Sequence, residues 1–216
     1  MMVDKQQTPE SRSRGRGKYD RSRSQRERRQ AQRDALLDAA TTVFATRGFA
    51  LATVELIVGT AGMSRRTFYE HFVDIRDILL RVHERAAQLA FGLVRDLTAS
   101  EPDPLQRIRA GITAYLSMIA SYPEVASVVL REVRSAGPDY EPRRELETTR
   151  YASLLFEALA IAHAQGKLSR PPDELTVYAL ATSVESVAMR YIGRGEAARA
   201  PEAADKLADL VIRAFL

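Results

Sequence analysis

Residues 53–72 constrain the fold most strongly, because they hold two short helical segments joined by a tight turn. The stretch reads TVELIVGTAGMSRRTFYEHF. Thr53 is suited to cap the first helix, Gly62 to make the turn, and Ser64 to cap the second helix. In a helix-turn-helix of this kind the second helix can enter the major groove of DNA. The segment therefore predicts a helical domain that binds DNA.

The rest of the chain is also patterned for helices, about nine in all, and shows no alternating pattern typical of strands. A first helix is predicted from about Ser24 to Gly48. A helix of about 24 residues follows Asp74, and further helices begin near Asp103, Pro123, Pro142, Asp173 and Pro201. The buried stripe predicted for the long helix is Ile75, Ile78, Leu79, Val82, Ala86, Leu89, Leu93 and Leu97. The fold class predicted is all-α.

Composition excludes several other classes of protein. The 216 residues are 45% apolar and 28% charged, as in a globular protein, and hold no Cys for disulfides or thiolate chemistry. No apolar run approaches the length of a membrane span, and the N-terminus lacks the apolar core of a signal peptide. We therefore expect a cytoplasmic protein with no membrane partner.

The positive charge of the chain is concentrated at its N-terminus. Residues 1–33 hold eleven Lys or Arg against four Asp or Glu, whereas the remainder has a net charge of −3. We expect residues 1–23 to form a disordered basic arm that is attracted to nucleic acid. Arg14 and Arg16, in an Arg-Gly-Arg sequence, are candidate contacts in the DNA minor groove. General phosphate attraction, a solubilising tail and contact with anionic lipid are the alternatives.

The order of these features resembles the TetR family of bacterial transcriptional regulators. The resemblance is specific over about residues 30–80 and rests afterwards on helix number and length. It is carried by Ala39-Ala40, Phe44, Gly48-Phe49, Thr53-Val54, Ile57, Ala61-Gly62-Met63-Ser64 and Thr67-Phe68-Tyr69-Glu70-His71-Phe72. It implies a homodimer that binds a palindromic operator and is released by a small molecule.

The resemblance also implies a division of the chain. Residues 24–80 would form a three-helix DNA-binding domain, and residues 81–216 a larger domain for effector binding and dimerisation. Two positions depart from the family pattern. Ile75, followed by Arg76, stands where a phosphate-binding Lys is usual, and Gly59 stands where the second helix usually has a better helix former.

The DNA contacts expected lie mainly in the helix-turn-helix. They are Thr53, Ser64, Arg65, Arg66, Thr67, Tyr69, His71 and Arg76. Arg65 or Arg66 could pair bidentately with guanine, with phosphate contact as the alternative. Thr53 could be only a helix cap, and Tyr69 a core residue with its hydroxyl at the surface. His71 is expected as a hydrogen-bond donor, since three His and no Cys give no metal-site spacing.

The larger domain offers candidates for effector binding and for dimerisation. By the resemblance, an effector cavity could be lined by Tyr115, Met118, Tyr122, Tyr151 and Phe156, although each alone could simply be core. No cluster of charged residues along the chain indicates the charge of the ligand. The last two helices are the expected dimer interface, because the terminal stripe Leu207, Leu210, Val211 and Phe215 needs a covering surface. Packing within the chain is the alternative.

Two rival functions remain. An enzyme would need a nucleophile with its base, a paired carboxylate site or a cofactor loop, and no such motif occurs, so we expect neither catalysis nor a cofactor. A DNA architectural or coating protein, driven by the basic arm and insensitive to effectors, is the main alternative to a sequence-specific repressor.

Overall fold

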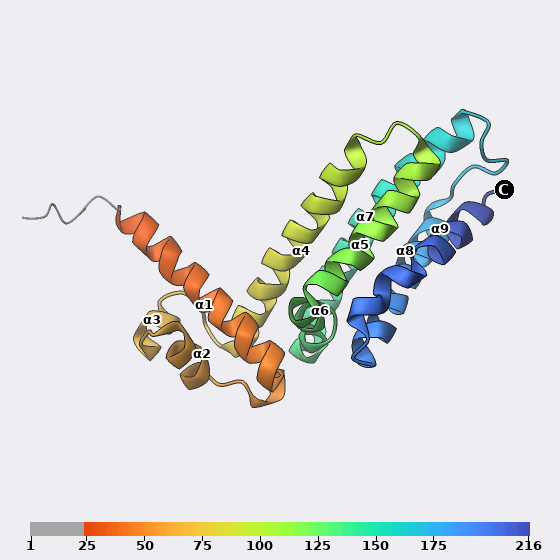
Figure 1. Ribbon diagram of the computed structural model, residues 1–216. Coiled ribbons are helices and arrows are strands. Elements are labelled where there is room, and N and C mark those ends of the chain that lie inside the picture. The colour runs from red at the N-terminus through yellow and green to blue at the C-terminus, as the bar shows by residue number, and fades with distance from the viewer. Residues whose placement is uncertain (1–23) are drawn as a thin grey trace, which may run out of the picture.

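The computed structural model describes residues 24–216, and every regular element in that range is helical (Figure 1). The α-helices are α1 (Gln25–Arg47), α2 (Val54–Ala61), α3 (Arg65–Tyr69), α4 (Ile75–Ala99), α5 (Pro104–Ser121), α6 (Pro123–Leu130), α7 (Glu141–Ala164), α8 (Glu174–Gly193) and α9 (Ala204–Arg213). Four 3-10 helices join them: η1 (Phe49–Leu51), η2 (Glu132–Ala136), η3 (Pro138–Tyr140) and η4 (Ala197–Ala203). The prediction of an all-α chain with about nine helices is confirmed. Arg14 and Arg16 lie outside the described residues.

Side-chain caps begin most of these helices where the sequence predicts them. Ser24 and Glu27 form a reciprocal capping box at the start of α1. Asp74, Asp103 and Asp173 accept backbone N–H bonds at the starts of α4, α5 and α8. Each cap satisfies amides that a helix leaves free at its first turn, so the local sequence sets these boundaries.

The molecule has two hydrophobic cores. One is built from α1 to α4 and includes Leu36, Phe44, Ile57, Phe68 and Leu79, all fully buried. Val128 of α6, Val133 of η2 and Tyr140 of η3 are buried in this same core, so the larger helical body packs directly onto the helix-turn-helix end. The other core joins α5, α7, α8, η4 and α9.

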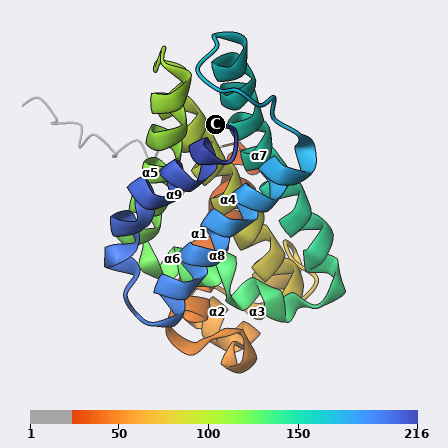
Figure 2. The ribbon, with the colours of Figure 1, turned by 90° about the vertical axis from the view of Figure 1, so that its right-hand side faces the viewer.

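Helix α4 connects these two parts of the molecule. It leaves the α1–α3 end and runs beside α5 and α7, whereas α8 and α9 lie on the side facing away from α4 (Figures 1 and 2). Within residues 24–216, no single helix combines the length and apolar composition needed to cross a bilayer; only α5 together with residues 123–134, a pair bent by 106°, meets those criteria.

The predicted stripe of α4 is wrong in its second half. Leu89, Leu93 and Leu97 are 70%, 47% and 55% exposed, and the buried positions are instead Ala87, Val94 and Thr98. The reason is close packing against α5. A Cβ added to Gly111 would lie 3.5 Å from the Thr98 methyl and 4.0 Å from Val94. The contact favours small side chains at the interface with α5, so the leucines do not pack there.

Three other predicted boundaries differ. The sequence predicts that the second helix of the helix-turn-helix runs to about Phe72 and that the helix from Pro123 ends near Gly137. Helix α3 instead ends at Tyr69, and α6 ends at Leu130, before η2. The terminal α-helix begins at Ala204, because Pro201 lies within the preceding 3-10 helix.

The terminal stripe is buried within the chain. Leu207, Val211 and Phe215 are 7%, 0% and 2% exposed, because α9 packs on α5, where Arg109 also pairs with Asp209 at 2.5 Å. Only Leu210 of the predicted stripe is exposed. Packing within the chain, the alternative that the sequence left open, therefore covers most of this stripe.

Candidate nucleic-acid interface and internal cavity

The turn between α2 and α3 has the geometry expected of a helix-turn-helix. Gly62 adopts the left-handed conformation with φ 65°, which an L side chain would strain. The Thr53 hydroxyl accepts from Leu56 N at 3.2 Å, and the Ser64 hydroxyl from Thr67 N at 3.1 Å. Thr53 and Ser64 therefore act as helix caps in this structure.

Arg65 and Arg66 lie at the start of α3 in different settings. Arg65 pairs with Glu55 of α2 at 3.0 Å, and a hydrogen bond with Tyr69 and the Glu55 charge raise its pKa above the usual range. The Arg66 side chain is 90% exposed and pairs with Glu70 one turn along at 3.1 Å. Because exposed pairs contribute little, a nucleic acid could take over either guanidinium.

The aromatic residues of this region are divided between core and surface. Phe68 and Phe72 are buried as predicted, whereas Tyr69 is 53% exposed and packs edge-on against Phe68. The His71 Nε2 is buried and has no hydrogen-bond partner in residues 24–216. Burial, followed by the charge of Arg29, lowers the His71 pKa. The surroundings of His71 therefore disfavour its charged form, and this nitrogen is turned away from solvent.

Basic side chains of α1 and α4 extend the exposed surface beside α3. Arg29 donates to the Glu70 carbonyl at 3.1 Å, and Arg33 lies over the Phe72 ring at 5.5 Å. Arg76, in the first turn of α4, is exposed. Arg29 and Arg33 were not predicted as part of this surface, because they stand about forty residues before the segment that they contact. The structure thus brings the predicted residues 64–76 together with the basic start of α1.

The larger helical body has an open cavity of about 960 Å³ between α4, α5, α6, α7 and α8. Its wall is mainly apolar. The residues include Leu89, Leu93, Val94, Ile108, Ile112, Met118, Ile119, Val125, Val129, Leu154, Leu155 and Val184. This size and chemistry are typical of a small-molecule binding site.

Four of the five predicted effector residues line this cavity. Tyr115 and Tyr151 meet edge to face with ring centroids 5.3 Å apart, and Met118 and Tyr122 complete the set. Burial raises the pKa of both Tyr115 and Tyr151, so their hydroxyls remain protonated. Phe156 does not line the cavity. It lies on another face of α7, packed against the core of α5 and α7–α9.

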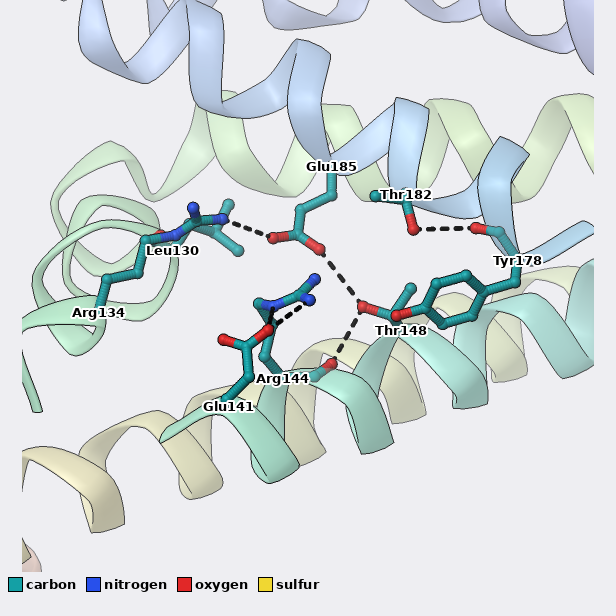
Figure 3. A network of polar contacts seen from close by, with 8 residues as sticks. All are labelled: Leu130, Arg134, Glu141, Arg144, Thr148, Tyr178, Thr182 and Glu185. Carbon is teal, nitrogen blue, oxygen red and sulfur yellow. Dashed lines mark hydrogen bonds and ion pairs between the residues drawn. The ribbon is translucent and has the colours of Figure 1, made fainter. Parts of the chain in front are cut away.

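One end of the cavity carries a network of polar side chains that the sequence analysis missed (Figure 3). The Glu185 carboxylate of α8 accepts from Arg134 of η2 at 3.2 Å and from the Thr148 hydroxyl of α7 at 3.4 Å. Arg144 lies beside Glu185 but donates to Glu141 at 2.6 and 2.9 Å. The sequence shows no cluster that indicates the charge of the ligand, and the structure assembles this one, with charges of both signs, from residues far apart in the chain. These residues come from three separated segments, and the only local signal is one acidic residue within the small and apolar stretch 177–188.

Other ionisable groups of the cavity are also buried. Burial lowers the pKa of His83 to about 4, so this ring is neutral near pH 7 and packs edge-on against Tyr140. Burial raises the pKa of Tyr140 to about 12, with a further contribution from Glu185. Burial also raises the pKa of Glu147, which pairs with Arg150 at 3.1 Å. Within residues 24–216, no group of three or more His, Asp or Glu side chains is placed to hold a metal ion.

A hydrogen bond links the polar end of the cavity to the helix-turn-helix part. Glu132 of η2 accepts from the Phe49 backbone N–H at 2.9 Å, directly after α1. Glu132 stands two residues from Arg134, the partner of Glu185. The same 3-10 helix therefore contacts both the cavity network and the segment between α1 and α2.

Two protein-family models match the chain. Residues 36–82 match the model described as bacterial regulatory proteins of the tetR family. Residues 101–215, more than half of the chain, match the model described as the tetracyclin repressor-like C-terminal domain.

Curated relatives and solved structures agree with these matches. The activator FasR of Mycolicibacterium smegmatis is 30% identical over 118 residues, covering 55% of this chain and 54% of that protein. The regulator EthR of the same organism is 26% identical over 151 residues, covering 69% of this chain and 68% of its own. The match thus spans about half the length of FasR. The fold also resembles FadR of Bacillus subtilis, solved with stearoyl-CoA (TM-score 0.75, 16% identity, 85% of this chain and 99% of that one). It resembles SmeT, solved with triclosan, as well (TM-score 0.72, 21% identity, 86% and 92%).

Proposed function

Because the chain belongs to the TetR family of bacterial regulatory proteins, we propose that it is a sequence-specific DNA-binding transcriptional regulator. We infer further that it is a repressor released by a small, largely apolar effector. The observation that carries this function is the combination, in one chain, of an exposed helix-turn-helix with a cavity of about 960 Å³. In this proposal residues 24–80 bind DNA and residues 81–216 bind the effector.

The proposed DNA contacts are the exposed side chains around α3. Arg65 and Arg66 would reach base edges or phosphates, and Tyr69 and Arg76 would contact phosphates. Thr53, Ser64 and Thr67 are engaged in caps, and the Ser64 and Thr67 hydroxyls lie 2.9 Å apart. Their contacts with DNA would therefore add to a capping role. The half-burial of His71 leaves it the least accessible of the predicted set.

The proposed effector is apolar because the cavity wall is apolar. The ligands in two structures of similar fold, stearoyl-CoA in FadR and triclosan in SmeT, are consistent with such a cavity. Release would follow from a change at α4, which lines the cavity, and at η2, whose Arg134 pairs with Glu185 of the cavity wall, since both elements also contribute to the core of the helix-turn-helix part. An effector acts in this way only if it binds one arrangement of these helices more tightly than the other.

The proposed assembly is a homodimer formed through α8 and α9. These helices lie on the face directed away from α4 (Figure 2). Each has an exposed leucine, Leu175 of α8 at 78% and Leu210 of α9 at 51%. A two-fold arrangement would place two copies of α3 on a palindromic operator, in the cytoplasm where the DNA lies.

The proposal is tested by titrating the purified protein onto DNA flanking its own gene, at physiological salt and with excess random competitor. We expect a protected, roughly palindromic site bound at least about 10³-fold more tightly than random DNA. Binding that the competitor abolishes would instead support an architectural protein driven by the basic arm.

A further inference from the structure

The cavity carries two half-buried carboxylates that the proposed function leaves without a role. The side chains of Glu185 and Glu147 are 14% and 17% exposed, compared with 23% for Arg144 and 33% for Arg85 on the same cavity wall. An ionised group buried to this extent needs a hydrogen-bond donor or an opposite charge. The carboxylates therefore bear on which ligands the cavity accepts.

Three of the four arginines of the wall are paired with acids, and the fourth, Arg107, donates to the Glu101 carbonyl. Arg144 makes two hydrogen bonds to Glu141, and Arg85 makes one to Asp38 at 2.7 Å. A carboxylate ligand would have to displace these acids and would also meet Glu185 and Glu147. By contrast, Glu147 Oε2 is buried and accepts no hydrogen bond within residues 24–216. Glu147 thus offers a vacant acceptor on the wall, whereas three of the four wall arginines already hold a carboxylate.

The surroundings of Glu185 favour a donor as well. Among the described residues its oxygens accept one bond from Arg134 at 3.2 Å, whose side chain is 49% exposed, and a long one from Thr148 at 3.4 Å. The Thr148 hydroxyl also donates to the Arg144 carbonyl at 3.0 Å, so its bond to Glu185 is the weaker of the two. The Tyr115 and Tyr140 hydroxyls are close enough for the Glu185 charge to raise the pKa of both. Aromatic rings beside a carboxylate form a good environment for a cation.

We propose that the cavity selects an effector with an apolar body and a terminal hydrogen-bond donor, a protonated amine in preference to a hydroxyl, which the Glu185 carboxylate binds. This inference rests on the proposed function, because it names the class of molecule that the regulator senses. A ligand donor would compete with Arg134 for Glu185. Arg134 belongs to the same 3-10 helix as Glu132, which holds the Phe49 backbone, so this competition is also the signal that reaches the helix-turn-helix.

The test uses three probes with the same ten-carbon chain: decylamine, decan-1-ol and decanoate. Each is titrated calorimetrically into the full-length protein, below the concentration at which it forms micelles and without DNA. We expect decylamine to bind about tenfold more tightly than decanoate, with decan-1-ol between them, because a bond to a charged acceptor contributes about this factor. Decanoate binding as tightly as decylamine, or no binding of decylamine, would overturn the proposal.

Two variants assign the preference to Glu185. Glu185→Gln should weaken decylamine binding about tenfold and leave decanoate no weaker. Glu145→Gln, which removes an exposed carboxylate of α7 that does not line the cavity, should change none of the three. Unchanged decylamine binding by Glu185→Gln would contradict the assignment. If that variant does not fold, the order of the probes on the unmodified chain still decides the ligand class.

Failure of this inference is distinguishable from failure of the proposed function. Operator binding is measured separately, on DNA, without a probe. A protein that binds its operator but prefers decanoate keeps its function as a regulator and loses the amine specificity. A protein that prefers decylamine but shows no operator loses the function and keeps the ligand class.

Discussion

At the scale of single residues, the two neighbouring arginines at the start of α3 differ in how firmly their side chains are held. Arg65 is held by Glu55 and Tyr69, whereas Arg66 has only an exposed partner one turn along the same helix. An arginine that is already oriented loses less side-chain entropy when it meets a base edge. Arg65 is therefore the better candidate for base recognition, and Arg66 the better candidate for a phosphate.

We expect Arg65→Ala to cost about 1–3 kcal/mol of operator binding and to relax the preference for one base, most simply guanine. Arg66→Ala should weaken binding to all sequences equally and lower the magnitude of the salt slope by about 1. Both variants are measured on a panel of operators that differ at single positions. An unchanged base preference in both variants would reduce both residues to phosphate contacts.

Residues that act on their own sequence neighbourhood were predictable, and residues that act across the fold were not. Thr53, Ser64 and Asp74 are caps because each bonds an amide three residues along the chain. Glu185 meets Thr148 and Arg134, which stand 37 and 51 residues away, and no local pattern encodes that meeting. Phe156 was predicted to line the cavity, because it is an aromatic residue close in sequence to residues that do. It lies on another face of α7 and packs against the core instead.

At the scale of elements, two glycines of the helix-turn-helix have opposite requirements. Gly59 lies inside α2 with ordinary helical geometry, whereas Gly62 has φ 65°. A Cβ added at either position would meet no atom within 4 Å, so only backbone preference distinguishes the two.

Gly59→Ala should therefore raise the free energy of unfolding by up to about 1 kcal/mol, because alanine favours a helix. Gly62→Ala should lower it by about 1 kcal/mol or more, because an L residue is strained at this φ. Urea unfolding of both variants at one protein concentration gives the comparison. Equal effects of the two substitutions would show that the turn is not held in the left-handed conformation in solution.

The positions of the helices in the sequence were easier to predict than which side of each helix is buried. The long helix α4 begins at the residue after Asp74, as its cap predicts. Its buried face is displaced by one position in the second half, from Ala86, Leu93 and Leu97 to Ala87, Val94 and Thr98. That change arises from close packing at Gly111, a tertiary contact on which the periodicity of α4 carries no information.

At the scale of the whole molecule, the basic residues of segment 1–23 bear on how strongly the protein holds DNA. Removing residues 1–23 should lower the magnitude of the salt slope of operator binding by about 0.9 for each phosphate that the segment neutralises. The slope is measured by repeating the titration at several salt concentrations with the full chain as control. An unchanged slope would exclude the segment, with Arg14 and Arg16, as a DNA contact. A loss confined to A·T-rich flanks would favour the minor groove.

The length of helix α4 determines how far a small tilt of this helix would move the helix-turn-helix. Its 25 residues form one continuous helix that begins next to the helix-turn-helix and runs along the cavity. A rod of that length measures about 37 Å, so a tilt of about 5° at its far end would swing its start by about 3 Å. In a symmetric dimer the two swings add, and the recognition helices would move by about 6 Å relative to half-sites spaced about 34 Å apart. As a lever arm, α4 would convert a small tilt around a bound ligand into a spacing of the two recognition helices that no longer matches the spacing of the half-sites on DNA.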